Sequence, residues 1–411
     1  MNRAAKIVTI VSLLAALILG FVAGHYSGSL TGGPTSIETR LVTVTERVET
    51  THTEKWTTTV LQVIHKAEPE TVVKYAEHFS ITRLGGYTLV RDGVNRTILL
   101  VPENSSIPNI HADLVVRTPV KRAVLMSATH IALIERLREY SPELLNNVAG
   151  IMWGEAYGWF FPDVEKMLGE GRIKDVGAAW SPDYERLLEI KPDLVMIYTF
   201  PGDPVVSKLE ELGIPYVVNN EYLETSLLGR FEWIKFVAAF FNLDDVADRI
   251  FQYVEMSNNL TVSKVQAFIG SGQSRPLKVV WFSVYRGTAY VSAGDSYVAK
   301  ALKELGAVYV FSDLSGTGSA SVSLEELVSR AADADVIVVS TDLIKSKDEL
   351  IQEIPQLELS KAFKEGRVFR FDDDIYQLGY YDTEGWLKDV AAILWPDVFG
   401  DRELEYFVPL R

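Results

Sequence analysis

Residues 175–198 read DVGAAWSPDYERLLEIKPDLVMIY, and this stretch decides the fold. It predicts a glycine turn, a capped helix and a buried strand in succession. Ser181 is the expected helix cap because a serine side chain accepts hydrogen bonds from the first backbone N–H groups, and Pro182 suits the first helical position. Residues 194–198 form a continuous apolar run, which is typical of a parallel strand covered on both faces. The stretch therefore predicts one helix–strand unit of an α/β fold.

A second unit of the same kind lies further along the chain. Residues 323–328 (SLEELV) begin another capped helix, and residues 335–340 (DVIVVS) form another short apolar run. Two such units far apart in one chain indicate a duplicated architecture with two α/β lobes. Between them, residues 244–269 have helical periodicity and predict a single helix that spans both lobes.

The order of these motifs resembles one known family. The succession of a glycine turn, Ser-Pro, a glutamate, an apolar helix and a KPDLV strand is similar to the substrate-binding proteins of ABC importers that carry ferric siderophores, haem and cobalamin. Residues 119–133, 209–218 and 289–306 look like that family's opening strand with its cleft loop, its helix-to-strand step and the start of its second lobe. The resemblance covers roughly residues 115–400.

This resemblance implies a function as well as a fold. It implies a protein that captures a metal chelate, foremost a ferric siderophore-type iron complex, and delivers it to the permease and ATPase of an ABC importer. Cobalamin or haem is the alternative cargo. A surface sensor or adhesion module that uses the same fold is the alternative role.

Together these patterns predict an α/β fold with two Rossmann-like lobes of parallel sheet, joined by a long helix and preceded by a membrane helix and a small β element. The expected parts are a membrane anchor or signal segment at 1–27, a Thr/Ser-rich stalk at 28–69, an antiparallel β element at 70–118, an N-terminal lobe at 119–242, an interlobe helix at 243–270 and a C-terminal lobe at 271–411.

The N-terminal segment indicates the location of the protein. Residues 7–24 are apolar and follow the basic residues Arg3 and Lys6. The run is marginal for a spanning helix and long for a signal-peptide core, and its basic flank predicts that the rest of the chain lies outside the cell. We interpret it as an uncleaved anchor in the cell membrane; cleavage would instead release a secreted protein. Because the chain has no cysteine, it has neither a lipid-modified cysteine nor a disulfide.

Composition and motifs argue against other classes of function. The formal net charge of −15 disfavours binding to nucleic acid, whose phosphates require clustered basic residues. The sequence contains neither a Walker loop nor a G-x-S-x-G elbow, so no catalytic residue is expected. Six histidines and no cysteine make a bare metal receptor an unfavourable interpretation. We expect a monomer with no cofactor and no metal held by protein ligands alone.

Aromatic residues gather where loops are expected to face the cleft between the lobes. Flat rings suit a macrocycle or a catecholate complex, although core packing is the alternative role for such residues. The predicted cleft aromatics are Trp153, Tyr157, Trp159, Trp180, Tyr198, Tyr222, Tyr285 and Tyr290. Tyr198 would act as a phenolate ligand if the cargo is haem.

Two further residues are polar candidates for the same cleft. His130 lies in the loop after the first strand of the N-terminal lobe, where ligands of open α/β sheets bind, and it suits contact with iron or with an acidic ligand group. A helix-capping histidine is the alternative. Arg286 follows an apolar strand and suits pairing with the oxygens of an anionic chelate; a solvated arginine or an interlobe ion pair is the alternative.

Glu185 and Glu325 are the predicted docking residues. The resemblance implies one surface glutamate on each lobe that pairs with an arginine of the membrane permease, and these two occupy the matching helices. Acidic residues are also favoured in the first turn of any helix by the helix dipole. Glu326 competes with Glu325 for the role and completes a capping box with Ser323.

Overall fold

The computed structural model describes residues 39–44, 58–63, 70–71, 73–200, 202–272, 274–341, 343–400 and 402–411. The chain divides into two compact units, residues 1–69 and 70–411. In the first unit, β1 (Thr39–Val44) and β2 (Thr58–Val63) form an antiparallel hairpin. The predicted membrane segment and most of the predicted stalk lie outside the described residues. Within the described ranges, no helix is both long and apolar enough to cross a membrane.

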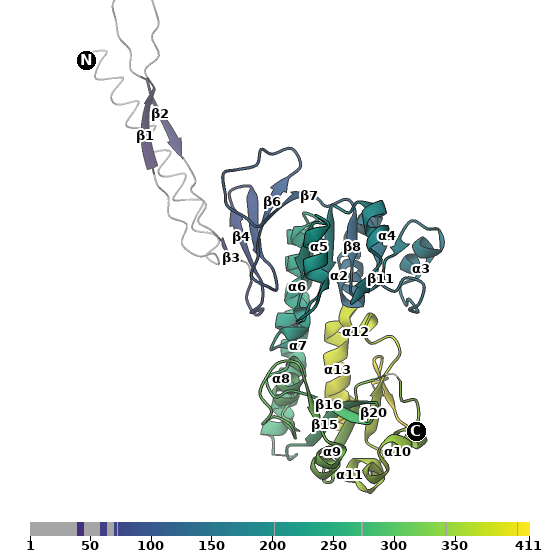
Figure 1. Ribbon diagram of the computed structural model, residues 1–411. Coiled ribbons are helices and arrows are strands. Elements are labelled where there is room, and N and C mark those ends of the chain that lie inside the picture. Colours follow the sequence, from purple (N-terminus) through teal and green to yellow (C-terminus); the bar gives the residue numbers. More distant parts are fainter. Residues whose placement is uncertain are drawn as a thin grey trace, which may run out of the picture. The chain divides into compact units, whose positions relative to one another are not determined.

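The second unit begins with a five-stranded sheet in the order β3-β4-β5-β6-β7 (Figure 1). Its strands are β3 (Glu70–Thr71), β4 (Ser80–Leu84), β5 (Tyr87–Arg91), β6 (Thr97–Pro102) and β7 (Leu114–Thr118). The sequence predicted an antiparallel element here, and this is wrong for the last pair, because β6 and β7 run parallel. Residues 103–113 form the connection that returns the chain to the start of β6, as a parallel pair requires. The inner face of this sheet belongs to the same hydrophobic core as α6 (Leu227–Ala239).

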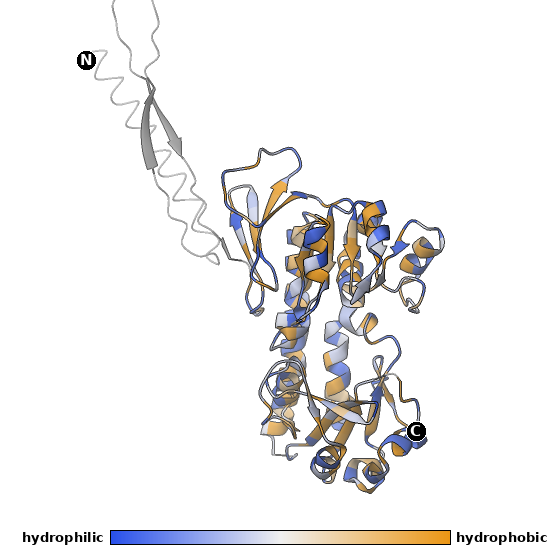
Figure 2. Ribbon diagram, in the orientation of Figure 1, coloured by the Kyte–Doolittle hydropathy of each residue, from blue (hydrophilic) through white to orange (hydrophobic). Residues whose placement is uncertain are grey.

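The N-terminal lobe is built on a parallel sheet in the order β10-β9-β8-β13-β14. Its strands are β8 (Ala123–Leu125), β9 (Val148–Ile151), β10 (Lys174–Asp175), β13 (Leu194–Ile197) and β14 (Tyr216–Val218). The other elements of the lobe are α2 (Ala128–Arg138), η2 (Pro142–Asn147), α3 (Pro162–Gly169), β11 (Gly177–Ala178), β12 (Ser181–Pro182), α4 (Tyr184–Ile190), α5 (Val205–Glu211) and η3 (Glu221–Leu223). Figure 2 shows the hydrophobic segments gathered in the strands, as expected for a sheet covered on both faces.

The C-terminal lobe has a mixed sheet in the order β18-β16-β15-β19-β20-β21, with β17 beside β15. Strands β15, β17, β19 and β20 run parallel, and β16, β18 and β21 pair antiparallel to their neighbours. The strands are β15 (Lys278–Tyr285), β16 (Thr288–Ser292), β17 (Val308–Tyr309), β18 (Ser319–Val322), β19 (Val336–Val339), β20 (Val368–Phe371) and β21 (Phe407–Pro409). The helices are α8 (Tyr297–Glu304), α9 (Leu324–Ala331), α10 (Lys347–Glu353), η4 (Pro355–Leu359), α11 (Lys361–Lys364), α12 (Leu378–Tyr381), α13 (Thr383–Leu394) and α14 (Pro396–Phe399).

One long helix joins the two lobes. Helix α7 (Asp244–Gly270) has 27 residues and is therefore about 40 Å long. Its first half packs Phe251 and Val254 into the core of the N-terminal lobe, and its second half packs Val265 into the core of the C-terminal lobe. Helix α13 packs against α7, and α12 packs against α2, so the C-terminal lobe also reaches back across the boundary (Figure 1). The predicted interlobe helix and the two-lobed α/β class are confirmed.

The two predicted helix caps have different outcomes. Ser323 accepts a hydrogen bond from the backbone N–H of Glu326 at 3.1 Å and caps α9 as predicted. Ser181 does not cap α4, because it pairs in β12 with Pro182; the cap is Asp183, whose Oδ1 accepts from the N–H of Arg186 at 2.9 Å. An aspartate two residues further on serves the same helix end equally well, so sequence alone places such a boundary poorly.

Candidate functional site

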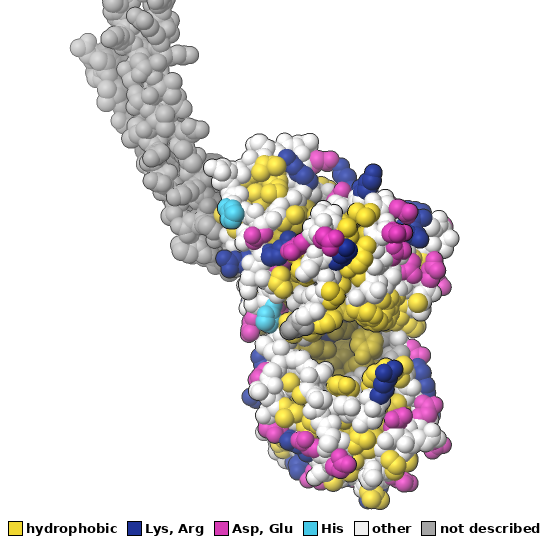
Figure 3. Space-filling view, in the orientation of Figure 1, with side chains coloured by type: hydrophobic (Ala, Val, Ile, Leu, Met, Phe, Trp, Pro, Cys, Tyr) yellow, Lys and Arg dark blue, Asp and Glu magenta, His cyan; other side chains and the backbone are white. Residues whose placement is uncertain are grey.

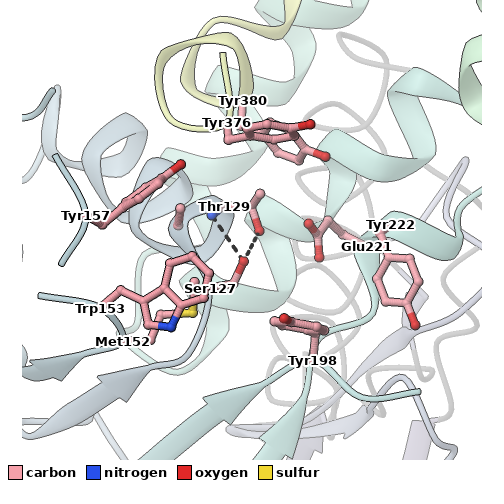
Figure 4. A pocket seen from close by; sticks show the side chains of 11 residues that line it. Ser127, Thr129, Met152, Trp153, Tyr157, Tyr198, Glu221, Tyr222, Tyr376 and Tyr380 are labelled. Atoms are coloured by element: carbon pink, nitrogen blue, oxygen red, sulfur yellow. Dashed lines mark hydrogen bonds between the residues drawn. The ribbon is translucent and has the colours of Figure 1, made fainter. Parts of the chain in front are cut away.

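The candidate site is a cavity of about 380 Å³ between the two lobes. Figure 3 shows hydrophobic side chains around a hollow at this boundary, and Figure 4 shows the residues that line the cavity. The lining residues are Ser127, Ala128, Thr129, Met152, Trp153, Tyr157, Tyr198, Glu221, Tyr222, Tyr376 and Tyr380. Six of these eleven residues are aromatic, and Glu221 is the only charged one.

The carboxyl ends of four parallel strands position most of the lining. Ser127 follows β8, Trp153 follows β9 and Tyr198 follows β13. Glu221 follows β14 and begins η3. Ligands of open α/β sheets bind at this edge, where consecutive loops diverge. The sheet topology therefore explains why residues nearly a hundred positions apart share one wall.

Trp153 is held in an unusual backbone conformation at the cavity wall. Its φ of +51° is in the left-handed region, which a bulky residue rarely adopts. Its N–H donates to the carbonyl of Gly177 at 2.9 Å, which fixes this turn. The indole meets Trp180 edge-on at 5.0 Å and Tyr157 at 5.9 Å between ring centroids. These contacts build an aromatic wall on one side of the cavity.

The C-terminal lobe supplies the opposite wall through Tyr376 and Tyr380, which lie above the cavity in Figure 4. Gln377, between them in the sequence, is buried and bonded to the N-terminal lobe. Its Oε1 accepts from the backbone N–H of Phe160 at 2.9 Å, and its Nε2 donates to the carbonyl of Gly158 at 2.7 Å. This amide holds the two tyrosines against the N-terminal lobe.

A polar corner interrupts the aromatic lining. The hydroxyl oxygens of Ser127 and Thr129 lie 2.7 Å apart, and Glu221 lies beside Thr129 (Figure 4). The carboxylate of Glu221 is only 4% exposed. Burial raises its pKa, whereas the Thr129 hydroxyl and the nearby charge of Arg230 act in the opposite direction. The corner thus offers hydroxyl groups and one buried carboxylate to a ligand.

Two phenols of the lining, those of Tyr198 and Tyr222, have raised pKa values and stay protonated at neutral pH. Burial, with the nearby Asp203 carboxylate, raises the pKa of Tyr198 above its ordinary value, and burial with the Glu221 charge does the same for Tyr222. The hydroxyl of Tyr222 donates to the carbonyl of Thr199 at 2.8 Å. These groups are therefore neutral hydrogen-bonding groups in the free protein.

Four of the predicted cleft residues line the cavity, namely Trp153, Tyr157, Tyr198 and Tyr222. Trp180 is 56% exposed and contacts the cavity only through Trp153. Trp159 is buried in the core of the N-terminal lobe, so its predicted place in the cleft is wrong.

His130 is not a cleft residue either. It lies in α2 with no exposed surface, and burial lowers its pKa to about 4, so the ring is neutral at physiological pH. Helix α2 begins at Ala128, so His130 is the third residue of the helix and is not part of the preceding loop. Ser127 and Thr129 reach the cavity in its place.

Three predicted residues lie on the β15–β16 hairpin and do not line the cavity. Tyr285 and Arg286 are exposed at its turn, with the Arg286 guanidinium 5.1 Å from the Tyr285 ring centroid. Tyr290 is half-buried in β16 beside Ser283 of β15. β16 folds back antiparallel directly after β15, and none of the residues of this hairpin is among the lining residues.

Sequence reasoning missed Ser127, Thr129, Glu221, Tyr376 and Tyr380. Glu221 carries the same signal that identified Tyr198, since it follows a buried strand by a few residues. Tyr376 follows the strand β20 by five residues and carries a weaker form of this signal. Tyr380 has no such signal, because it lies in α12, which packs on α2 of the other lobe.

The described residues contain no group of three or more His, Asp or Glu side chains arranged to hold a metal ion. A metal that enters this cavity would accordingly bring most of its own ligands. Tyr198 offers a single phenol oxygen and Glu221 a single carboxylate to such a complex.

The predicted docking residues are both on the surface. Glu185 is exposed in the first turn of α4, and Glu325 is exposed in the first turn of α9. Glu326 forms an ion pair with Arg330 at 2.8 Å, whereas no ion pair among the described residues involves Glu325. Of Glu325 and Glu326, Glu325 is therefore the better placed to meet a partner.

Comparison with known proteins supports one family. The family model described as "Periplasmic binding protein" matches residues 160–375. An uncharacterized lipoprotein of Methanocaldococcus jannaschii is 36% identical over 332 residues, which are 78% of this chain and 78% of that protein.

Solved structures show the same fold. A periplasmic heme-binding protein from Pseudomonas aeruginosa matches with a TM-score of 0.54 and 16% identity, over 68% of this chain and 94% of that one. A possible iron-binding periplasmic solute-binding protein from Staphylococcus epidermidis matches with a TM-score of 0.51 and 17% identity, over 68% of this chain and 100% of that one. With the family model and the archaeal relative, these matches show that the chain belongs to the periplasmic binding protein family, to which its sequence motifs pointed.

Proposed function

We propose that this protein captures a metal chelate outside the cytoplasm, foremost a ferric siderophore-type complex, and delivers it to an ABC importer. The observation that carries the proposal is the cavity itself, with six aromatic side chains at the boundary of two lobes. As a member of a binding-protein family, the chain is expected to bind its cargo without transforming it.

The lining suits a rigid, largely apolar complex. A cavity of about 380 Å³ falls within the range of small-molecule sites, which are commonly lined by aromatic side chains with a few polar groups. The outer surface of an iron chelate is mostly hydrocarbon, and its coordinating oxygens are already engaged by the metal. Aromatic rings therefore provide contact area, and the hydroxyls of Ser127 and Thr129 provide orientation.

Cobalamin and haem are the alternative cargoes. Both have flat macrocycles that match the Trp153 wall and the two tyrosines opposite it. The phenol of Tyr198 is placed to approach a haem iron, although its raised pKa means that a proton must leave first. A fold neighbour described as a periplasmic heme-binding protein is consistent with this alternative. A surface sensor or adhesion module remains the alternative of a different class.

Docking on the importer is assigned to Glu185 and Glu325, one on each lobe. Two carboxylates on rigid helices define an orientation, although each exposed ion pair adds little affinity by itself. Arginines of the permease are the proposed partners. Attachment to the membrane is assigned to the apolar segment at residues 7–24, since the chain has no cysteine for lipid modification.

The test is a titration of the full-length protein in mild detergent with a ferric hydroxamate, a ferric catecholate, haemin and cobalamin. Intrinsic fluorescence, corrected for ligand absorbance, reports binding because Trp153 lines the cavity. Saturable quenching by one ligand at micromolar concentration or below supports the proposal and identifies the cargo class. If none of the four binds, the chelate proposal is wrong and the sensor or adhesion role gains support.

A further inference from the structure

We propose that Glu221 selects the charge of the cargo, so that the cavity prefers a neutral or cationic chelate with an N–H donor over a chelate that carries free carboxylates. The inference rests on the proposed function and narrows its ligand class. It makes Glu221 a specificity-determining residue of the cavity.

The charges around the cavity support this assignment. No Lys, Arg or His is among the eleven lining residues, and Glu221 is the one ionisable acid among them. Burial raises the pKa of the Tyr198 phenol, and the nearby charge of Asp203 acts in the same direction. An anionic ligand would thus meet a carboxylate and no cation among the lining residues.

The charge of Arg230 acts on Glu221, but Arg230 is not among the residues that line the cavity. Its guanidinium is buried between the rings of Tyr297 at 4.4 Å and Tyr380 at 3.8 Å. Arg230 lies behind the lining, and its charge opposes the rise in the Glu221 pKa that burial causes, without offering its own donors to the ligand. An ionised Glu221 is a hydrogen-bond acceptor only, and an amide N–H or an ammonium group of the ligand matches it.

The consequences differ among the candidate cargoes. The core of a ferric tris-hydroxamate is neutral, because three deprotonated hydroxamates balance Fe³⁺, whereas a ferric tris-catecholate carries three negative charges. The two propionates of haem are also anionic. Cobalamin has a periphery of neutral amides. Glu221 therefore favours hydroxamate-type and corrinoid cargo over catecholates and haem.

A charge series on one iron core tests the inference. The ligands are a linear ferric tris-hydroxamate with a terminal ammonium group, its N-acetylated form and its N-succinylated form, which differ only at one end. We expect the full-length protein to bind the ammonium form at least about tenfold more tightly than the succinylated form, a difference of about 1.4 kcal/mol. The affinity for the acetylated form is expected to lie between the affinities for the other two.

Three variants assign the effect to Glu221. Glu221→Gln is expected to reduce the ratio between the ammonium and succinylated forms to about threefold or less. Glu155→Gln removes the same charge from an exposed side chain close to Trp153 but outside the cavity, and it is expected to keep the wild-type ratio. Glu221→Asp retains the charge and is expected to retain the order of affinities.

The possible outcomes separate this inference from the proposed function. Equal or tighter binding of the succinylated form by the wild type overturns the inference while the chelate function stands, and this holds even if Glu221→Gln does not fold. An unchanged ratio in a folded Glu221→Gln protein overturns it as well. If none of the three chelates binds, the proposed siderophore function fails and the charge selection fails with it.

Discussion

The guanidinium carbon of Arg230 lies 3.8 Å from the ring centroid of Tyr380, so a buried cation of the N-terminal lobe stacks on a tyrosine that lines the cavity. Tyr297 of the C-terminal lobe covers the same guanidinium at 4.4 Å. The contact joins α6 to α12 and α8, and it places the counter-charge of Glu221 at the boundary of the lobes. Ligand contact and lobe packing thus share one side chain, Tyr380.

The first prediction concerns the stability that Arg230 provides. Arg230→Met leaves Glu221 buried without a facing cation and removes two cation–π contacts, so the free energy of unfolding should fall by about 3 kcal/mol. Arg230→Lys should recover only part of this loss, because an ammonium group cannot stack between two rings as a planar guanidinium does. Urea denaturation of the purified protein measures both changes.

The control for this prediction is Arg249→Met. Arg249 is exposed and lies 5.4 Å from the ring centroid of Tyr140, so its loss should change stability by less than about 0.5 kcal/mol. If Arg230→Met were as stable as the wild type, the buried stack of Arg230 and the two tyrosines would contribute nothing to the free energy of unfolding.

A second prediction separates the two neighbouring tryptophans. Trp153→Gly removes the indole from the cavity at a position whose φ of +51° glycine adopts without strain. We expect ligand affinity to fall about tenfold, from the loss of aromatic contact area, while the midpoint of thermal unfolding changes little. Trp159→Phe is the matched control, because Trp159 is buried in the core and outside the cavity lining.

Isothermal titration calorimetry and thermal unfolding of the two variants test this pair, because Trp153→Gly removes the indole whose fluorescence reports binding. Trp159→Phe should keep the wild-type dissociation constant, and loss of its buried indole N–H, which has no hydrogen-bond partner among the described residues, should not lower stability by more than about 1 kcal/mol. Equal losses of affinity in both variants would contradict the cavity assignment of Trp153.

The third prediction is a pH dependence that comes from Asp335. Burial opposes its ionisation, but hydrogen bonds from Arg275 at 2.9 Å, Lys361 at 2.6 Å and the backbone N–H of Lys278 at 2.8 Å prevail and lower its pKa well below the ordinary value. A carboxyl group whose pKa is lowered in the folded protein contributes stability above its unfolded pKa of about 4. That contribution is lost as the pH falls below this value.

Asp335→Asn should therefore lower the free energy of unfolding by about 2–3 kcal/mol at pH 7. The difference from wild type should shrink steadily below pH 4, because Asp335 then takes up a proton in the unfolded chain but stays ionised in the folded protein. Denaturation at pH 7, 5, 3.5 and 2.5 measures the trend, and Asp333→Asn, at an exposed neighbouring position, serves as the control. A difference that stays constant down to pH 2.5 would exclude this explanation.

The sequence predicts the elements of this protein better than it predicts the site. Residues 194–198 and 335–340 gave correct strands, since a continuous apolar run reflects burial on both faces of a parallel sheet. The 27-residue helix was also predictable, because its periodicity is a local property. Tyr380 was not, because it reaches the cavity through the packing of α12 on α2, a contact between distant segments.

The surroundings of the side chain explain why the predicted and observed positions of His130 differ. His130 occupies a suitable loop-to-helix position in the sequence, yet one residue of shift along α2 turns it into the interior while Thr129 faces the cavity. Adjacent side chains of a helix point about 100° apart. An error of one residue in the predicted position along the helix therefore replaces a residue that faces the ligand with one that faces the core.

The last prediction concerns delivery to the importer. Reversal of both exposed carboxylates, in Glu185→Lys with Glu325→Lys, should leave the dissociation constant for the chelate unchanged, because neither residue lines the cavity. Each lysine would face an arginine of the permease in the proposed complex, and like charges at both ends of the contact oppose docking. We therefore expect uptake of the labelled chelate, measured in vesicles with the reconstituted importer, to fall at least tenfold.

The control for this prediction is Glu326→Lys, because Glu326 forms an ion pair with Arg330. This variant should lower the stability of α9 but have little effect on uptake. Undiminished uptake by the double variant would show that the two glutamates do not form the docking contact.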